Sequence, residues 1–288
     1  MPGLPDPAIF SEHRLATEPT VYRSDLLRDQ VFLISGGGSG IGRATAFLAA
    51  RLGARVMICG RREEKLAQAA SAISRHLGRE IAWLPSNIRD PAQVDTLVER
   101  TLEKYGRIDC LVNSAGGQFR QDAIEFSKKG WNAVIDTNLN GTWNMIQAVG
   151  RCWRDGRQPG NVVSIVLNLR NGRPYSAHTG AARAGVISLT QSLAIEWAPL
   201  NIRLNCIAPG TIDSSGLDTY EVPVDKQRMK NNNPMRRLGS VWEIAEGVIY
   251  LAGPSGSFIT GELLAIDGGA QFWGPSWPEG RPEHFKDY

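Results

Sequence analysis

The chain has 288 residues, of which 42% are hydrophobic and 21% are charged, and its formal net charge is +3 at pH 7. This balance is typical of a globular protein and does not indicate one that binds nucleic acid or an anionic membrane. No apolar run reaches the roughly 18 residues needed to cross a bilayer, and the N-terminus lacks the basic and apolar segments of a signal peptide.

Short apolar runs alternate with helical stretches along most of the chain. After a proline-rich N-terminal arm at residues 1–27, we expect seven strands: 31–35, 55–59, 80–86, 108–115, 161–168, 202–209 and 261–269. The helices expected between them cover residues 42–53, 62–77, 91–106, 129–151, 179–198 and 241–252. Continuous apolar strands joined by helices predict right-handed βαβ units and a parallel sheet covered on both faces. Residues 28–270 are therefore predicted to form a single α/β domain, a doubly wound Rossmann fold, followed by a C-terminal tail at 271–288.

The glycine-rich segment SGGGSGIG at residues 35–42 directly follows the first expected strand and opens the first expected helix. Glycine allows a tight turn and a close approach of the backbone to a pyrophosphate, and the helix N-terminus supplies free N–H groups. A flexible glycine-rich connection is the alternative, but the strand–turn–helix context favours a dinucleotide site. The residues of this turn that we expect to bind the cofactor are Gly36, Gly38, Ser39, Gly40 and Ile41.

The end of the second expected strand indicates which dinucleotide is bound. Sites for NAD usually place a carboxylate there to accept from the ribose 2′-OH, whereas this chain has Gly60 followed by Arg61 and Arg62. A guanidinium group fits a phosphate monoester, so we predict NADPH as the cofactor and assign both arginines to its 2′-phosphate. The alternative is that the two arginines are solvated residues at the start of a helix, a position where arginine is unfavourable.

Together with later motifs, this pattern resembles the short-chain dehydrogenase/reductase family over nearly the whole domain. The later motifs are Asn87–Ile88, with Asn in place of the usual Asp, Asn113–Ser114–Ala115–Gly116, TNLNGT (137–142), IAPGTIDS (207–214) and FITGELLAIDGG (258–269). The resemblance implies a nicotinamide cofactor. The further residues that it assigns to cofactor binding are Asn87, Ile88, Asn113, Ala115, Gly116, Asn138, Arg183, Pro209, Gly210, Ile212 and Ser214.

One branch of the family is more similar than the others. The segments SNIRD (86–90), GGQF (116–119) and HTGAARAGVISLTQSLAIEWA (178–198) resemble the peroxisomal trans-2-enoyl-CoA reductases and their 2,4-dienoyl-CoA reductase relatives. Those enzymes use NADPH to reduce a C=C bond conjugated to a thioester, and the family resemblance implies a homotetramer. The C-terminal KDY is not the SKL-type peroxisomal address, and the four cysteines form no Cys-x-x-Cys pair, so we expect reduced thiols and a cytoplasmic location.

The chain departs from the family at its catalytic residues. The family's active lysine falls on Arg183, its tyrosine on Thr179 and its serine on Val166, so Asn138 alone is kept of the usual four. The lysine ammonium normally lowers the pKa of the phenol, which then exchanges a proton with a carbonyl or alcohol oxygen. Threonine is far too weak an acid for this exchange, and arginine is a permanent cation that cannot relay a proton. Reversible ketone–alcohol chemistry is therefore disfavoured unless another acid has replaced the tyrosine.

Reduction of a conjugated thioester makes different demands. Hydride is added at Cβ, and positioned donors stabilise the negative charge that develops on the thioester oxygen. The first hypothesis is therefore an NADPH-dependent reductase of an α,β-unsaturated acyl thioester, with Tyr175, Arg183, Asn138 and Thr179 as its catalytic residues. One alternative is a carbonyl reductase or dehydrogenase that uses a relocated acid such as Tyr175. The other is a catalytically silent dinucleotide-binding partner or sensor.

Several residues near this region are candidate donors or substrate contacts. Tyr175 lies four residues before Thr179, one turn earlier if the helix extends that far back, and its alternative role is that of a surface residue. His178 is a second candidate donor, with a structural role as its alternative. The residues that we expect to line the substrate pocket are Gln118, Phe119 and Asn168.

Two further features bear on the substrate. The segment 213–237 is long, polar and poorly patterned, which is typical of an active-site lid. Arg170 and Arg173 either meet the phosphates of a CoA or are solvated. We assign no metal site.

Overall fold

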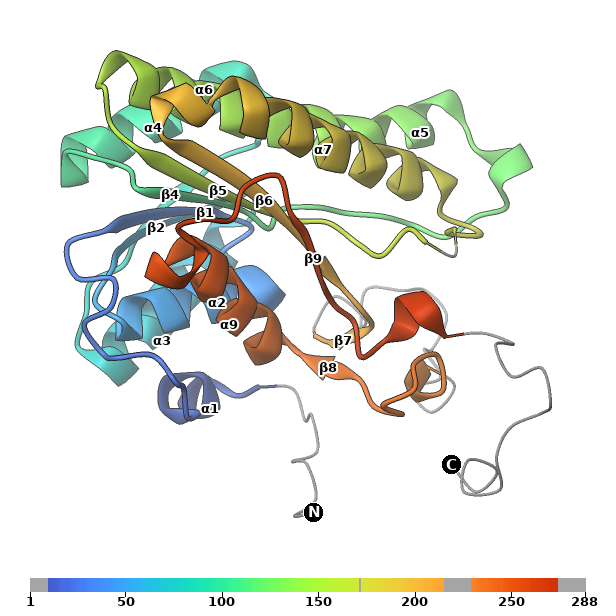
Figure 1. Cartoon of the computed structure of the whole chain (residues 1–288), viewed down its shortest axis with the longest axis horizontal. Coiled ribbons are helices and arrows are strands. Elements are labelled where there is room, and N and C mark those ends of the chain that lie inside the picture. The colour runs from blue at the N-terminus through green and yellow to red at the C-terminus, as the bar shows by residue number, and fades with distance from the viewer. Residues whose placement is uncertain (1–9, 171, 215–228, 274–288) are drawn as a thin grey trace.

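The computed structural model describes residues 10–170, 172–214 and 229–273 of the chain. A seven-stranded sheet has the order β3-β2-β1-β4-β5-β6-β9, and every neighbouring pair is parallel (Figure 1). The strands are β1 Val31–Ser35, β2 Arg55–Gly60, β3 Ala82–Pro85, β4 Cys110–Asn113, β5 Gly160–Ile165, β6 Ile202–Pro209 and β9 Leu263–Ile266. All seven expected strands are present, so the doubly wound α/β fold is confirmed.

Helices cover both faces of this sheet (Figure 1). One face carries α2 Gly40–Arg51, α3 Glu63–Leu77 and α9 Val241–Ala252, and the other carries α4 Pro91–Tyr105, α6 Gly141–Asp155 and α7 Ala177–Glu196. Successive side chains of β1 point to opposite faces of the sheet. Phe32 and Ile34 therefore pack in one apolar core, and Leu33 packs in the other. Burial on both sides explains why the strands are continuous apolar runs rather than alternating ones.

The described part of the N-terminal segment packs on the domain. Its helix α1 (Glu12–Thr17) follows Phe10, whose ring stacks on Trp242 of α9 with centroids 6.3 Å apart. Leu15 and Leu27 are fully buried and belong to the same apolar core as α2 and α9. This segment, which the sequence sets apart as an arm, therefore contributes to the core on the α2–α9 face.

The helix expected over residues 129–151 is interrupted in its middle. The structure has α5 (Lys128–Ile135), a π-helical turn over Asp136–Asn140, and then α6. A π-helical turn closes its hydrogen bonds five residues apart, so it adds one residue and rotates the next helix about its axis, and such turns occur frequently at functional sites. Asn138 lies in this turn, which sets the direction of its side chain.

The carboxyl ends of the parallel strands lie at one edge of the sheet, where ligands bind in folds of this kind. Beyond this edge, β7 (Ile212–Asp213) pairs with β8 (Gly239–Ser240). Most of the candidate lid lies outside the described residues, as do residues 274–288 of the expected tail. None of the helices in the described ranges combines the length and the apolar character that crossing a bilayer requires.

The four cysteines are free thiols, as expected. Cys59, Cys110 and Cys206 are buried, and Cys152 is partly exposed. Burial raises the pKa of Cys59 to about 12 and that of Cys206 to about 11, because a thiolate is poorly solvated there. These two thiols are therefore protonated at neutral pH and are poor nucleophiles.

Candidate active site

The glycine turn after β1 is shaped by a close approach of the backbone. Gly36 has φ +71°, and a Cβ at this position would lie 2.8 Å from the backbone nitrogen of Ala115, which follows β4. The N-cap of α2 is Ser39, whose side chain does not cap the helix. The first N–H groups of α2 are therefore available to an anion, and the turn fits the pyrophosphate of a dinucleotide.

The arginine pair lies beside this turn. Arg61 and Arg62 are both exposed and directly follow β2, and α3 begins one residue later. The start of α3 touches the glycine turn, since a Cβ on Gly38 would lie 3.2 Å from the backbone of Lys65. The geometry thus places two guanidinium side chains at the strand end where the adenine ribose of a dinucleotide lies in this fold.

The adenine side of the groove is formed by the loop after β3. Ile88 is buried against Gly141, where a Cβ would lie 2.7 Å from the Ile88 side chain. Asn87 accepts a hydrogen bond from the backbone nitrogen of Arg89 at 3.2 Å, and its own N–H donates to Gln93 at 2.9 Å. Asn at this position thus acts as a turn residue that fixes the loop.

The segment at residues 209–214 begins at the end of β6 and carries Pro209, Gly210, Ile212 and Ser214, of which Ile212 lies in β7. Gly210 packs so closely on the turn after β9 that a Cβ would lie 2.7 Å from the Cα of Asp267. Ser214 faces the start of α2, because its Cβ lies 3.9 Å from the position of a Cβ on Gly40. The predicted nicotinamide loop and the start of the helix that follows the predicted phosphate turn therefore lie next to each other.

Asn138 fixes the backbone of the loop after β4. Its amide accepts a hydrogen bond from the Gly117 N–H at 3.0 Å and donates to the Gly117 carbonyl at 2.8 Å. In the same region Asn113 donates to the Ser164 hydroxyl at 3.3 Å, and its buried Oδ1 has no hydrogen-bond partner among the described residues. Asn138 is thus a positioning group for the Gly116–Gly117 loop, and Asn113 keeps a buried acceptor unused within the described ranges.

Arg183 is a buried cation at the centre of this region. It lies against Gly116, where any Cβ would overlap its Nη2. Its Nη1 is buried and has no hydrogen-bond partner among the described residues. Burial lowers the pKa of Arg183 to about 10, because a charged guanidinium is poorly solvated there. The guanidinium thus keeps a buried donor unused within the described residues, next to the Gly116 backbone.

Thr179 and His178 form the first turn of α7, and both are buried. The Nδ1 atom of His178 lies 2.8 Å from the backbone nitrogen of Thr179 and 3.3 Å from its hydroxyl. The imidazole ring stacks on Phe126 and meets Phe119 edge to face. Burial lowers the pKa of His178, which keeps the ring neutral.

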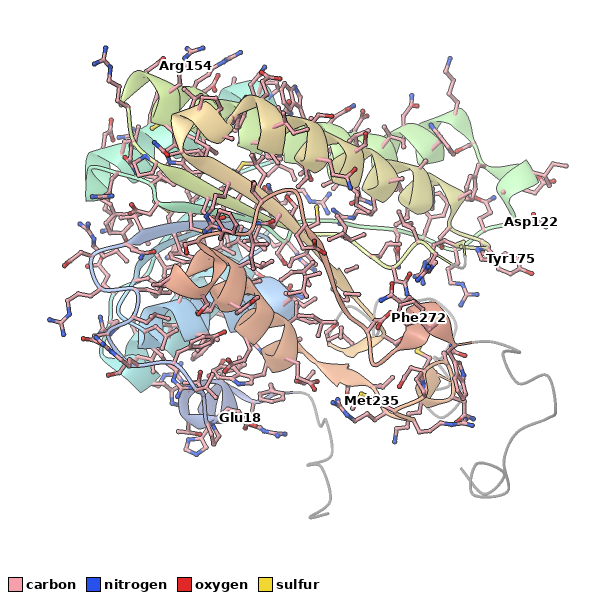
Figure 2. All side chains as sticks on the ribbon, viewed as in Figure 1. Glu18, Asp122, Arg154, Tyr175, Met235 and Phe272 are labelled. Carbon is pink, nitrogen blue, oxygen red and sulfur yellow. The ribbon has the colours of Figure 1, made fainter. Side chains whose placement is uncertain are left out.

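Tyr175 lies apart from these buried groups. Because α7 begins at Ala177, Tyr175 precedes the helix, so the expected one-turn relation to Thr179 does not hold. Tyr175 has φ +62° and is 54% exposed, and its ring packs under the guanidinium of Arg120 at 5.6 Å. Its carbonyl accepts from the backbone of Gln121, which places Tyr175 beside the loop of Asp122 at the edge of the molecule (Figure 2).

The three predicted substrate residues are placed differently from one another. Phe119 packs on His178, next to Thr179. Gln118 is exposed in the loop after β4. The Asn168 amide donates to Asp267 at 2.8 Å, and its Oδ1 accepts from the backbone of Arg170 at 3.0 Å. The Asn168 side chain therefore ties the loop after β5 to the turn after β9.

Sequence reasoning missed two elements of this arrangement. Asp267 anchors its own turn by accepting from the backbone nitrogens of Gly269 and Gln271, both within 2.9 Å. The sequence Asp267–Gly268–Gly269 indicated the end of a strand. It did not reveal the hydrogen bond between Asp267 and Asn168, which are 99 residues apart. The contact of His178 with Phe126 was also missed, since no short spacing links these residues.

Comparisons with known proteins agree with this geometry. The family described as enoyl-(acyl carrier protein) reductase matches residues 36–271. A peroxisomal 2,4-dienoyl-CoA reductase of Mus musculus is 36% identical over 270 residues, 92% of each chain. A probable 2,4-dienoyl-CoA reductase of Bacillus subtilis is 35% identical over 247 residues, covering 84% of this chain and 97% of that one. The crystal structure of a short chain dehydrogenase from Bacillus anthracis has a TM-score of 0.81 and 36% identity, covering 88% of this chain and 100% of that one.

Proposed function

Because the chain belongs to the short-chain dehydrogenase/reductase family, we propose that it is an NADPH-dependent reductase of α,β-unsaturated acyl thioesters. The observation that carries this proposal is the buried Arg183, which packs on Gly116, keeps an N–H donor unused among the described residues and takes the place of the family's lysine. The residue in the tyrosine position is Thr179, and the nearby Tyr175 is exposed. This set of groups suits stabilisation of an oxyanion rather than proton exchange with an alcohol.

The preference for NADPH is supported by charge at the end of β2. Arg61 and Arg62 follow Gly60 directly, so no carboxylate occupies the position that accepts from a 2′-hydroxyl. Two guanidinium groups attract a phosphate monoester and can bind it bidentately. The glycine turn would hold the pyrophosphate, and the backbone around Ile212 would hold the carboxamide.

The proposed mechanism assigns each group near Gly116 a separate task. When bound, NADPH supplies the hydride that is added at Cβ of the thioester. Arg183 donates from Nη1 to the thioester oxygen, on which negative charge develops, and its buried setting strengthens this interaction. Asn138 holds the Gly116–Gly117 backbone, against which Arg183 packs, and so keeps the guanidinium in place.

Protonation at Cα is the remaining step, and none of the buried side chains near Arg183 in the described ranges provides an acid for it at neutral pH. Burial lowers the pKa of His178, and it raises the pKa of the Cys206 thiol to about 11. Thr179 does not ionise in this range. We therefore propose that water protonates Cα after the hydride has been added.

The substrate class follows the names of the relatives. The two relatives named above are 2,4-dienoyl-CoA reductases, and the matching family is described as an enoyl-(acyl carrier protein) reductase. A 2,4-dienoyl-CoA carries a C=C bond conjugated to its thioester, and the products named for the two relatives are a (3E)-enoyl-CoA and a (2E)-enoyl-CoA. We propose this bond as the target and leave the choice of CoA or carrier protein to experiment.

One assay tests this function against its alternatives. Purified protein is mixed with NADPH and, in separate reactions, crotonyl, longer enoyl, 2,4-dienoyl and ketoacyl thioesters. Oxidation of NADPH with enoyl or dienoyl substrates but not with ketoacyl ones supports the proposal. Turnover of ketones or alcohols alone, abolished by Tyr175→Phe, would establish the carbonyl reductase with a relocated acid. Tight NADPH binding without turnover of any substrate would identify the silent dinucleotide-binding protein.

We also propose that the chain assembles as a homotetramer. Two large apolar side chains are exposed near the end of α7, Ile195 (81% exposed) and Phe258. The chain segment after Phe258 lies on α7, since a Cβ on Gly261 would be 3.4 Å from that of Ala194. We propose that these exposed side chains form part of a contact between subunits. Light scattering should give a mass four times the 31.5 kDa of one chain. The cytoplasmic location stays a prediction.

A further inference from the structure

Two arginine–aromatic pairs lie on the turn after β9, and the mechanism proposed above uses neither of them. The guanidinium of Arg170 lies over the ring of Phe272, 4.8 Å from its centroid, and that of Arg236 lies 5.4 Å from the ring of Trp273. Arg170 comes from the loop after β5, and Arg236 comes from the segment that leads to β8. Three separate parts of the chain thus meet at one surface, at the same end of the molecule as Tyr175 (Figure 2).

Hydrogen bonds between the same segments hold these pairs in place. Asn168 donates to Asp267 at 2.8 Å, and its Oδ1 accepts from the backbone of Arg170 at 3.0 Å. The indole nitrogen of Trp273 donates to the carbonyl oxygen of Asn231 at 3.0 Å. The arginines and the rings are therefore positioned by the fold before any ligand binds.

The ring of Phe272 has a face that is open to a ligand. Phe272 is 66% exposed although Arg170 covers one face of its ring, so the opposite face is in contact with solvent. An exposed aromatic face binds a nucleobase by stacking, and it does so with any base because every base has a π-face. The surface therefore offers a stacking platform.

The charge beside this platform suits phosphate. Arg170 is exposed, and no carboxylate among the described residues forms an ion pair with it. The carboxylate of the turn itself, Asp267, is 8% exposed and accepts three hydrogen bonds, so its charge is shielded from the surface. A guanidinium without an acidic partner is available to phosphate oxygens.

The loop that carries Arg170 runs from this surface to the predicted reaction site. Val166 takes the place of the family's serine and precedes Arg170 by four residues, so the two Cα atoms are at most about 14 Å apart. Leu169 lies against the first turn of α7, because a Cβ on Gly180 would be 3.9 Å from its side chain. Gly180 directly follows Thr179. A ligand with its base on Phe272 can therefore extend an arm along this loop to the start of α7.

We infer that Phe272 and Arg170 form a binding site for the nucleotide of coenzyme A, with the adenine base on the open face of Phe272 and phosphate at Arg170. The substrate is then a CoA thioester rather than the thioester of a carrier protein. This inference rests on the proposed function, because it names the carrier of the same acyl group. A carrier protein holds the same pantetheine arm on a serine phosphate and has no adenine base, so it would leave the ring of Phe272 unused.

The first test measures binding and needs no turnover. CoA is titrated calorimetrically into the full-length protein saturated with NADP⁺, which occupies the predicted site at Arg61 and keeps the adenosine of CoA out of it. Phe272→Leu should weaken CoA binding about tenfold, while Phe272→Tyr, which keeps the ring, should stay within about twofold of the parent. No binding of CoA by the parent, or the same affinity in the two variants, would overturn the inference.

A second titration examines the charge. Arg170→Gln should weaken CoA binding about fivefold at low ionic strength and less at high ionic strength. Arg154→Gln is the control, since it removes the same charge at the other edge of the sheet: Arg154 precedes β5, whereas Phe272 follows β9. No loss in Arg170→Gln, or a loss just as large in Arg154→Gln, would contradict the assignment of phosphate to Arg170.

Kinetics with two substrates then separate a nucleotide site from a merely structural role. Crotonyl-CoA and crotonyl-pantetheine have the same reacting groups, but only crotonyl-CoA has a nucleotide. Phe272→Leu should raise KM for crotonyl-CoA about tenfold at unchanged kcat, because the nucleotide contributes equally to the ground state and the transition state. Both constants for crotonyl-pantetheine should stay within about twofold of the parent.

Equal changes with the two substrates would overturn the inference. A parent protein that reduces a crotonyl carrier protein with a lower KM than crotonyl-CoA would also overturn it. If the parent reduces none of these thioesters, the proposed function fails, and the CoA titration still decides whether Phe272 and Arg170 bind the nucleotide.

Discussion

The glycine turn before α2 and the first two turns of α7 both contact the loop after β4, but they are built by different means. The turn acts through its backbone, because Gly36 leaves no room for a Cβ and the side chain of Ser39 does not cap α2. The start of α7 acts through side chains: His178 and Arg183 are buried, and each has a nitrogen without a hydrogen-bond partner among the described residues. Buried unpartnered groups destabilise a fold, so their presence indicates a role in ligand binding or chemistry.

A second comparison is between Arg183 and Arg203. Arg203 is partly buried, and it donates to the carbonyl oxygens of Gly256, Ile259 and Leu251 at 2.6 to 3.0 Å. Arg203 therefore joins loops of the fold, whereas Arg183 keeps a donor unused. The difference suggests that one arginine serves stability and the other serves the reaction.

The largest expected effect is that of Arg183→Met. Removing the donor to the thioester oxygen should lower kcat/KM for an enoyl thioester about 10²- to 10³-fold. The melting temperature should rise by about 2 °C, because burial lowers the pKa of Arg183 and the charged form is therefore destabilising in the folded state. Steady-state kinetics and thermal unfolding provide the two measurements.

Arg203→Met is the matched control for this variant. It removes three hydrogen bonds to carbonyl oxygens, so it should lower the melting temperature. The melting temperature is therefore expected to rise in Arg183→Met and to fall in Arg203→Met. A melting temperature that falls equally in both would show that Arg183 has partners in the folded state and would remove the basis of the comparison.

The next effect in size is that of Gly116→Ala. A Cβ here would overlap Nη2 of Arg183 and lie 3.0 Å from Oδ1 of Asn138. Because the guanidinium must move, kcat/KM should fall about 10²-fold. Gly117→Ala is the control, since a Cβ at that position meets no atom within 4 Å. Similar losses in the two variants would indicate a general sensitivity of this loop rather than displacement of Arg183.

A smaller effect concerns the predicted 2′-phosphate site at the end of β2. Arg61→Asp should weaken NADPH binding at least about tenfold, because a carboxylate repels the 2′-phosphate that the arginine attracts. NADH lacks this phosphate and serves as the control within the same titration, where its affinity should change little. Equal changes for both cofactors, measured by fluorescence titration, would show that Arg61 is a solvated residue.

The smallest effect is a dependence of stability on pH. Burial lowers the pKa of His178 below its usual value of 6.5, so the unfolded chain takes up a proton before the folded one does. The resulting stabilisation is complete above about pH 6.5 and is lost as the pH falls through the folded-state pKa. Between pH 7.5 and 5.5 the parent should lose about 1 kcal/mol or less relative to His178→Asn in urea unfolding. A difference between the two that does not change with pH would show that the His178 pKa is not lowered by folding.

The sequence predicted the parts of the fold that depend on local pattern. β1, β6 and α9 have the bounds expected from apolar runs and turn residues, and the glycine turn has the geometry that its spacing indicates. The interruption between α5 and α6 was not predicted, because a π-helical turn leaves the apolar pattern of a helix almost unchanged.

Side chains of the candidate site were harder to place, since their directions depend on residues distant in sequence. Asn168 was expected to face the substrate, but Asp267 of a distant turn accepts its amide. Tyr175 was considered as a donor, but α7 begins after it and its ring lies under Arg120. The alignment of Arg183 with the family's lysine was available from the sequence, whereas its unpartnered Nη1 could be recognised only in the structure.

The most direct test of the proposed reaction is the fate of the hydride. NADPH carrying deuterium at C4 is oxidised with crotonyl-CoA by the parent protein and by Tyr175→Phe, and the products are examined by NMR and mass spectrometry. The account predicts a saturated acyl thioester with deuterium at C3, formed by both proteins at similar rates. The account would be contradicted if no label reached crotonyl-CoA while a ketone substrate gained deuterium at its carbinol carbon, and only in protein that keeps Tyr175.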